Sequence, residues 1–475
     1  MTVATWRRGA AAIAGSIATL MLLAACSSDG PSEENAEATT QPSPTQETPT
    51  QEADTQEVAG CEMYVEYQDT QEASVSIFTS IVAPQQGLFE QSWKEFETCT
   101  GIDIVYEGSD QFEAQLSARI AGGNAPDIAF IPRPSLLAEL VAGGGPVPAS
   151  QDTVSNADTY WNPEWKSYGT VNGTFYAAPL GSHMNSFVWY SPKTFAANGY
   201  AIPTTWDELW ALSDQMVADG LVKPWCGGLE AGSQTGWPST DWLEEIMLRM
   251  FGGEVYDQWV SHELDFDSPQ VTAAMDVLAG WMKNANYVNG GFGDVQTIAT
   301  TPFQEAGRSI LNGECGMLQQ SNLYASTWGE LQVGATIGPD GDVYAFYIPV
   351  INNMVAPQPV VGDGEFVTAF SDRPAVAAVQ SYLSSAEFAT SKVSLGTWVS
   401  ANNGVPLDTY AEGSIDKLAA QYLTDMGGTF RFDASELMPA VVGAGAMLTE
   451  MTQWFALGTP TAEVLQAIDA AWPVP

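Results

Sequence analysis

From about residue 74 onward, short apolar runs alternate with amphipathic helical patterns, and this alternation limits the fold more than any other feature. Val75–Phe78, Ile102–Tyr106 and Pro126–Phe130 are typical of strands. Between them, aromatic and aliphatic residues recur at helical spacing in 89–96 and 112–120. A strand–helix–strand order predicts right-handed crossovers and a mainly parallel sheet. We therefore expect an α/β protein.

Two helix starts are marked clearly further along the chain. Thr205 and Glu208 form the pattern of a capping box, in which each side chain bonds to the backbone of the other residue. Ser268 followed by Pro269 predicts a second helix start, because proline is favoured at the first helical position. The apolar stripes of these helices are expected to be core.

The first 25 residues have the pattern of an export signal. Arg7 and Arg8 precede an uncharged run that ends at Ala25, and a basic start, a short apolar stretch and small residues describe a secretory signal peptide. The Leu23–Cys26 segment resembles the bacterial lipobox, whose cysteine is lipidated and becomes the mature N-terminus. We expect residues 1–25 to be a lipoprotein signal peptide and Cys26 to carry the lipid; a weak N-terminal anchor helix is the alternative.

Residues 26–61 are rich in Ser, Thr, Pro, Glu and Gln and contain no Lys or Arg. A segment with so few apolar side chains cannot bury enough surface to offset the entropy of ordering. We predict an acidic, disordered linker that spaces a folded body from the membrane.

The chain has 57 acidic and 15 basic residues, which gives a formal net charge of −42. Such a charge repels phosphate backbones and argues against a nucleic-acid partner. Hydrophobic residues make up 45% of the chain, which is ample for a folded core.

Four cysteines remain after Cys26. An even number in an exported chain favours two disulfides over metal ligands. Three pairings are possible, and proximity along the chain favours Cys61–Cys99 and Cys226–Cys315. No cysteine pair has the short spacing of a zinc site, and the chain has only 2 histidines. We therefore expect no metal and no cofactor.

Common catalytic motifs are absent from the sequence. The chain has no phosphate-binding loop of the G-x-x-x-x-G-K type, no G-x-S-x-G elbow and no H-E-x-x-H. A carboxylate pair of the glycosidase kind is not excluded by a chain this acidic. We expect a binding protein and keep a secreted glycoside hydrolase as an alternative.

Three stretches resemble the carbohydrate-binding lipoproteins of ABC importers, the solute-binding family that includes maltose-binding protein. They are Phe112–Gly145, Gly173–Leu209 and Gly307–Tyr324, and the resemblance spans residues 74 to about 470. The segments Pro224–Cys226 and Thr235–Trp242 look closest to the α-glucoside-binding branch. In that branch the Cys226–Cys315 pairing is the expected one.

The resemblance implies the type II periplasmic-binding-protein fold, with two lobes joined by hinge crossovers. Each lobe is then a mainly parallel sheet flanked by helices. When the family's lobe boundaries are transferred to this sequence, the first lobe comprises residues 62–184 plus 362–412, and the second comprises 185–361 plus 413–475. One sugar is expected in the cleft between them, and the lobes close around it like a hinge.

The resemblance also implies which residues bind the sugar. A sugar needs planar polar side chains that grip its hydroxyls and an aromatic face for stacking. The candidates are Arg133, His183, Asn185, Trp237, Asp241, Gln320, Asn322, Tyr324, Glu365 and Trp398.

Five of these candidates also have a structural alternative. Arg133 would then pair with a surface acid, His183 would make a hydrogen bond between the lobes, and Glu365 would form a hinge salt bridge. Trp237 and Trp398 would be packing residues.

The leading hypothesis is a lipid-anchored receptor on the extracytoplasmic face of the cell membrane. It captures an α-glucoside and presents it to the subunits of an ABC permease, without catalysis and as a monomer. The main rival keeps this role with another sugar or a polyol as ligand. A sensor lipoprotein that reports a ligand to a partner kinase is a further alternative.

Overall fold

The computed structural model describes residues 60–67, 74–220, 223–289, 295–351, 357–425 and 427–473. All of them belong to one compact unit, Glu57–Pro475. The predicted signal peptide, Cys26 and nearly all of the 26–61 linker lie outside the described residues. Among the helices that are described, none is long and apolar enough to cross a lipid bilayer.

A first sheet of five strands has the order β2-β1-β3-β14-β6. β1 is parallel to β2 and β3, whereas β14 is antiparallel to β3 and β6. Four strands therefore point one way and one points the other. The strands are β1 (Ser74–Thr79), β2 (Asp103–Gly108), β3 (Ile128–Ile131), β6 (Ala177–Pro179) and β14 (Phe366–Ala369).

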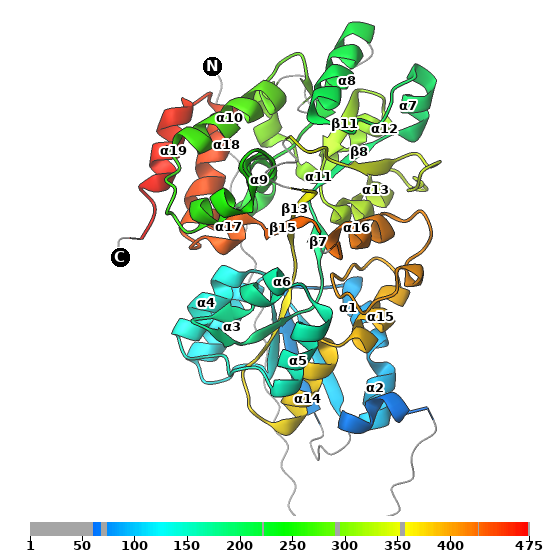
Figure 1. Cartoon of the computed structure of the whole chain (residues 1–475), viewed down its shortest axis with the longest axis vertical. Helices are drawn as coiled ribbons and strands as arrows, with labels where there is room; N and C mark the ends of the chain where they lie inside the picture. The colour runs from blue at the N-terminus through cyan, green and yellow to red at the C-terminus, as the bar shows by residue number, and fades with distance from the viewer. Residues whose placement is uncertain are drawn as a thin grey trace, which may run out of the picture. The chain divides into compact units, whose positions relative to one another are not determined.

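Helices from residues 62–168 and from residues 374–409 surround the first sheet (Figure 1). A short hairpin of β4 (Thr170–Val171) and β5 (Thr174–Phe175) lies before β6 in the chain. The helices are η1 (Glu62–Tyr67), α1 (Gln85–Ser92), α2 (Lys94–Thr100), α3 (Phe112–Ala121), α4 (Pro134–Ala142), α5 (Gln151–Tyr160), α6 (Pro163–Tyr168), α14 (Pro374–Leu383), α15 (Ala386–Ser394) and η5 (Leu407–Thr409).

A second sheet has the order β10-β9-β11-β8-β12 and repeats the plan of the first. β9 is parallel to β10 and β11, and β8 is antiparallel to β11 and β12. The predicted α/β class with two mainly parallel sheets is thus confirmed, with one reversed strand in each. The strands are β8 (Phe187–Tyr190), β9 (Lys223–Cys226), β10 (Val288–Asn289), β11 (Cys315–Gln319) and β12 (Tyr344–Tyr347).

The helices associated with the second sheet include α9, which runs over Trp237–Val260 with a kink at Gly252 (φ 81°, ψ 176°). The capping box predicted at Thr205 and Glu208 opens α8, and Ser268 caps α10 with Pro269 in its first turn. The remaining elements are α7 (Pro192–Asn198), α8 (Trp206–Asp219), η2 (Gly232–Gln234), α10 (Pro269–Met282), η3 (Val295–Thr300), α11 (Phe303–Ala306), α12 (Arg308–Leu311), η4 (Asn322–Tyr324) and α13 (Ala325–Leu331).

The last part of the chain adds α16 (Ile415–Leu423), α17 (Ala434–Leu437), the π-helix η6 (Val442–Met447), α18 (Leu448–Ala456) and α19 (Thr461–Asp469). α18 packs against α9, and α19 packs against α10 and α18. α17 contacts both α9 and α4, so it lies where the two halves of the molecule meet.

A small third sheet carries the chain between the two larger ones. It contains β7 (His183–Met184), β13 (Pro359–Asp363) and β15 (Thr429–Phe432), and β13 pairs with both of the others. Figure 1 places these strands between the two large sheets. The lobe boundaries predicted at 184/185 and 361/362 fall at the end of β7 and inside β13.

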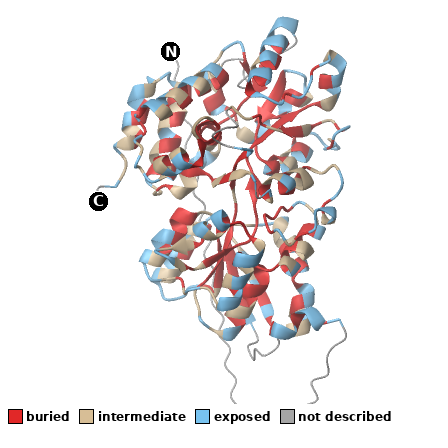
Figure 2. Cartoon of the chain, viewed as in Figure 1, coloured by how far each residue is buried: buried red, intermediate tan, exposed pale blue. Residues whose placement is uncertain are grey.

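The apolar core has two main clusters. One surrounds the first sheet and extends to alternate residues of the second sheet, such as Trp189 and Leu318. The other contains the residues between them, such as Val188 and Met317, and Figure 2 shows the buried residues concentrated on the strands.

The two disulfides that chain proximity favours are both formed. Cys61 and Cys99 have Cα atoms 5.3 Å apart. Cys226 and Cys315 have Cα atoms 5.6 Å apart and lie on the neighbouring strands β9 and β11.

A buried ion pair ties α9 to the crossing segments. Glu245 and Arg249 form this pair with both side chains 0% exposed. The Arg249 guanidinium also donates to the Ile348 and Pro349 carbonyls at 3.2 Å. The Ser186 hydroxyl donates to Glu245 Oε1 at 2.6 Å and accepts from the backbone N–H of Val361 at 3.0 Å. Because Ser186 follows β7 and Val361 lies in β13, this network fixes α9 relative to both strands.

We predict that Arg249→Met lowers the free energy of unfolding by about 3–5 kcal/mol, because it leaves the Glu245 carboxylate buried without its partner. The double variant Glu245→Met/Arg249→Met should lose less than the single one, since no unpaired charge remains. Urea unfolding followed by tryptophan fluorescence measures both. A single variant no less stable than the double would contradict the role of this pair.

Candidate functional site

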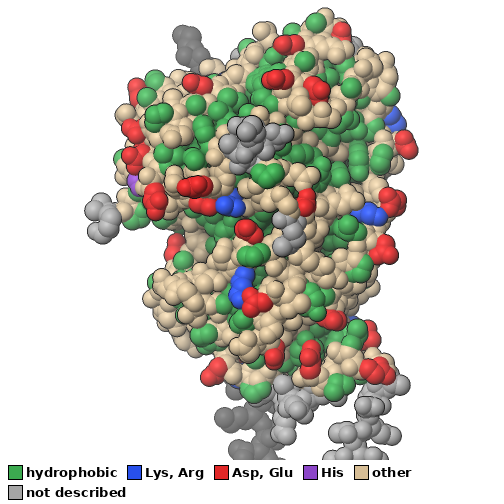
Figure 3. All heavy atoms as spheres, in the orientation of Figure 1, with side chains coloured by type: hydrophobic (Ala, Val, Ile, Leu, Met, Phe, Trp, Pro, Cys, Tyr) green, Lys and Arg blue, Asp and Glu red, His purple; other side chains and the backbone are tan. Residues whose placement is uncertain are grey.

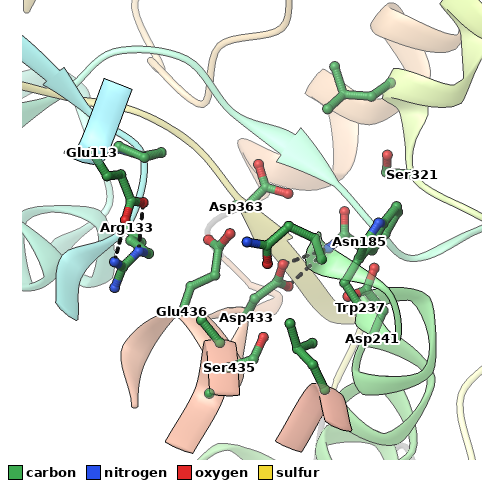
Figure 4. A pocket seen from close by; sticks show the side chains of 16 residues that line it. Glu113, Arg133, Asn185, Trp237, Asp241, Ser321, Asp363, Asp433, Ser435 and Glu436 are labelled. Atoms are coloured by element: carbon green, nitrogen blue, oxygen red, sulfur yellow. Dashed lines mark hydrogen bonds and ion pairs between the residues drawn. The ribbon is translucent and has the colours of Figure 1, made fainter. Parts of the chain in front are cut away.

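A cavity of about 400 Å³ lies among loops and helix ends that follow strands of both large sheets. Its wall combines residues from α3 and the β3–α4 loop with residues from α9, the crossing strands and α17 (Figure 4). The lining residues are Glu113, Pro132, Arg133, Asn185, Gln234, Trp237, Asp241, Ser321, Leu323, Asp363, Asp433, Ser435, Glu436, Gly443, Ala444 and Leu448.

Trp237 is the aromatic side chain of this wall. It is the first residue of α9, and its ring meets the ring of Phe303 edge-on with 5.0 Å between centroids. The preceding Gly236 has φ +111°, and a Cβ there would lie 2.4 Å from the Leu448 carbonyl oxygen. Glycine is therefore required to start the helix at this point, and it places the half-buried Trp237 at the cavity.

Acidic side chains dominate the polar part of the wall. Five of the lining residues are acids and only Arg133 is basic. The Arg133 guanidinium is already engaged, because its Nε and Nη2 donate to the Glu113 carboxylate at 2.9 and 2.6 Å. The outer surface has the same bias, and Figure 3 shows far more acidic than basic side chains on the visible face. The cavity thus offers many hydrogen-bond acceptors and few free donors.

Asn185 and Asp433 form the best-defined hydrogen bonds of the cavity. The Asn185 amide donates to both carboxylate oxygens of Asp433 at 2.9 Å, and both residues are buried. Asn185 directly follows β7 and Asp433 directly follows β15. In Figure 4 the carboxylates of Asp363 and Glu436 point toward the same space.

Burial and mutual repulsion raise the pKa values of this group of acids. The pKa of Asp241 and that of Asp433 lie well above the usual range, first because the carboxyls are desolvated and then because other carboxylates surround them. The pKa of Glu436 also lies well above its usual range, because its carboxyl is buried and other carboxylates lie near it. Behind the wall, burial raises the pKa of Glu244 to about 7. Hydroxyl donors or a positive charge from a bound molecule would relieve this repulsion.

Four of the ten predicted ligand-binding residues line this cavity: Arg133, Asn185, Trp237 and Asp241. The third predicted segment also reaches it, through Ser321 and Leu323. Its three named candidates are buried and bonded elsewhere. Gln320 Oε1 accepts from the Ser321 N–H at 3.1 Å, Asn322 Oδ1 accepts from the Met184 N–H at 2.7 Å, and the Tyr324 hydroxyl donates to the Gln304 carbonyl at 2.7 Å.

The other three candidates lie together away from the cavity lining. His183 pairs with Asp363, and its ring meets the Trp398 ring edge-on with 6.2 Å between centroids. Trp398 and Glu365 are buried. The Lys392 ammonium lies 4.6 Å from the centre of the Trp398 ring. His183 thus bonds within the crossing sheet, since its partner Asp363 belongs to β13.

Sequence reasoning missed Glu113, Asp363, Asp433, Ser435 and Glu436 as cavity residues. For Asp433 the sequence offers one indication, because a polar residue directly after a strand such as Thr429–Phe432 is a typical position for a binding residue. The approach of α17 to α4 and α9 gives no local pattern in the sequence.

Two α/β lobes, crossing strands and a cavity between the lobes define a receptor for a small solute that binds at the seam. The chain belongs to the family of bacterial extracellular solute-binding proteins, whose model matches residues 82–392. The predicted class of protein is thereby confirmed: an extracytoplasmic solute receptor of ABC importers, and not an enzyme.

Two curated relatives match most of the chain. An osmoprotective compounds-binding protein, GgtB, of Synechocystis is 33% identical over 85% of this chain and 94% of its own length. An alpha-glucosides-binding periplasmic protein, AglE, of Rhizobium meliloti is 31% identical over 87% of this chain and 90% of its own length.

Solved structures of the same fold include two sugar receptors. The bacterial solute receptor AcbH, whose described preference is for β-D-galactopyranose, has a TM-score of 0.69 at 20% identity and covers 84% of this chain and 97% of its own. A cyclic alpha-maltosyl-1,6-maltose binding protein from Arthrobacter globiformis has a TM-score of 0.61 at 17% identity. The match covers 84% of this chain and 97% of that protein. At these identities the likeness concerns the fold.

We predict that His183 makes stability fall as the pH rises. Burial by itself lowers the pKa of His183, but the adjacent Asp363 carboxylate outweighs burial and raises it to about 9. Because the unfolded value is about 6.5, this stabilisation is complete below about pH 6.5 and lost as the pH passes 9. It amounts to roughly 3 kcal/mol.

Urea unfolding of wild type and His183→Asn at pH 6.5 and 9.5 tests this prediction. The difference between the two proteins should shrink at the higher pH, and groups such as Lys392, whose pKa burial lowers to about 8, contribute equally to both. An equal loss at both pH values for His183→Asn would contradict the charged pair.

Proposed function

We propose that this chain captures an α-glucoside-type oligosaccharide in the interlobe cleft and presents it to the permease of an ABC importer. The observation that carries the proposal is the cavity wall, which sets one half-buried tryptophan beside a group of carboxylates. Hydroxyl groups of a sugar donate to carboxylates, and the C–H face of a sugar ring stacks on an indole. The alpha-glucosides-binding relative, alignable over 87% of this chain, supports the choice of ligand.

The chemistry of the wall favours a neutral ligand rich in hydroxyls over an anionic one. The carboxylates of the wall would repel a carboxylate or phosphate group, and the single guanidinium is already paired with Glu113. Asn185 and Asp433 would each bind hydroxyls, and Trp237 would stack on the ring. No covalent step is part of this function; binding shifts the equilibrium between open and closed lobes.

A polyol or another small glycoside is the second candidate ligand. It is favoured by the relative named for osmoprotective compounds, which is 33% identical to this chain. The same wall would serve either ligand, because both present adjacent hydroxyls.

We predict that the protein binds at least one α-linked glucoside and that Trp237→Ala weakens this binding about 5- to 150-fold, which corresponds to roughly 1–3 kcal/mol. Isothermal titration with maltose, trehalose, sucrose, cellobiose and sorbitol measures both statements. Trp210→Ala is the control, because Trp210 packs on Trp206 and Tyr287 away from the cavity. Binding of sorbitol alone would select the polyol, and no heat at millimolar concentration with any compound would reject the proposal.

We further propose that Cys26 carries the lipid that holds the receptor at the outer face of the membrane. Cys26→Ser should release the protein from the membrane fraction and abolish its labelling by a radioactive fatty acid. Cys226→Ser is the matched control, since that cysteine is disulfide-bonded and should leave labelling unchanged. Retained labelling of Cys26→Ser would place the lipid elsewhere.

A further inference from the structure

Three carboxylates meet at the wall of the cavity, two of them on the wall and one directly behind it. Asp241 and Glu244 come from the first two turns of α9, and Asp433 comes from the end of β15. One oxygen atom of each lies within 4.8 Å of the other two. Around a Ca²⁺ ion bound at about 2.3–2.6 Å, ligand oxygens are separated by up to roughly 5 Å. The three residues thus have the spacing of ligands to one ion.

Glu244 provides an independent indication of a ligand at this point. Its side chain is 0% exposed. Its Oε1 accepts a hydrogen bond from the Ser435 N–H at 3.1 Å, whereas its Oε2 is buried and has no hydrogen-bond partner among the described residues. A buried carboxylate oxygen without a donor is costly, and such groups normally have a partner. The head of this side chain lies within the carboxylate cluster, so a ligand there would supply the missing partner.

Protein cations do not neutralise the cluster. Among the ion pairs between described residues, none includes Asp241, Glu244 or Asp433. The two arginines of the region are committed, because Arg133 pairs with Glu113 and Arg249 pairs with Glu245. The high pKa values of the cluster have the same cause, since burial and neighbouring carboxylates both disfavour ionisation.

We propose that Asp241, Glu244 and Asp433 form a divalent-cation site in the cleft and that its occupant is Ca²⁺. All three ligands are hard carboxylate oxygens, with no nitrogen or sulfur donor, which is the donor set that Ca²⁺ takes. Asp241 and Asp433 line the cavity, so the ion reaches the site through it. Ca²⁺ binds six to eight oxygens, and its remaining positions face the cavity.

Calorimetric titration of the full-length protein, purified in detergent and stripped with EGTA, tests the site with CaCl₂ alone. We expect one ion per chain with a Kd below about 1 mM, the upper end for extracellular calcium modules. Thermal unfolding should shift upward with added CaCl₂. Glu244→Gln keeps the shape of the side chain and removes its charge, so it should weaken binding at least tenfold and lose the thermal shift.

Asp241→Asn serves as a second variant, with the same expectation, if Glu244→Gln does not fold. Asp265→Asn is the matched control: this aspartate belongs to another carboxylate and histidine cluster, with His262 and Asp469, and its side chain is 68% exposed. It should bind Ca²⁺ as the wild type does. Absence of one-site binding up to 10 mM CaCl₂, or unchanged binding in the folded Glu244 or Asp241 variant, overturns the proposal.

The ion titration contains no sugar, so its result is separate from that of the proposed function. A protein that binds a glycoside but not Ca²⁺ would overturn the cation site alone. A protein that binds Ca²⁺ but none of the glycosides would keep the site and reject the proposed ligand class.

Discussion

The buried contact between α9 and the crossing strands is the interaction on which the cleft depends. The Glu245–Arg249 pair and the Ser186 hydroxyl connect the middle of α9 to the segment after β7, to β13 and to the carbonyls of Ile348 and Pro349. The start of the same helix carries Trp237 and Asp241. Because a helix transmits position rigidly along its axis, this network sets where these two side chains stand relative to Asn185 and the end of β15.

The scarcity of basic residues determines the chemistry of the cleft. With 15 basic residues against 57 acidic ones, most carboxylates have no cation to pair with. On the surface, water solvates such groups at little cost, but in the cleft they are partly desolvated and close to one another. They therefore repel each other and attract hydrogen-bond donors or cations. The property that argues against a nucleic-acid partner for the whole molecule thus also leaves the cleft rich in acidic side chains, with Arg133 as its single basic lining residue.

The sequence predicted the fold class, but only four of the ten residues that it offered as ligand-binding line the cavity. Local signals were sufficient for the alternating strands and helices and for the capping box at Thr205, whereas the pairing of Cys226 with Cys315 was favoured by chain proximity and by the family resemblance. In the segment 320–324, Ser321 and Leu323 line the cavity, whereas the predicted residues Gln320, Asn322 and Tyr324 bond to the backbone. Which side chains of a short loop turn outward depends on the neighbours against which the loop packs, and those neighbours are distant in the chain.

The amino-acid sequence alone determined the α/β class, the helix starts, the excess of acceptors and the exclusion of nucleic acid, because each follows from local pattern or from composition. Only the tertiary structure decided that Asp433 and Glu436, nearly two hundred residues beyond Asp241, stand on the same wall. It also decided that His183 faces Asp363 across the crossing strands rather than the cavity. The physical reason is that burial and charge repulsion depend on distances in space, which arise only when three crossings of the chain bring remote segments together.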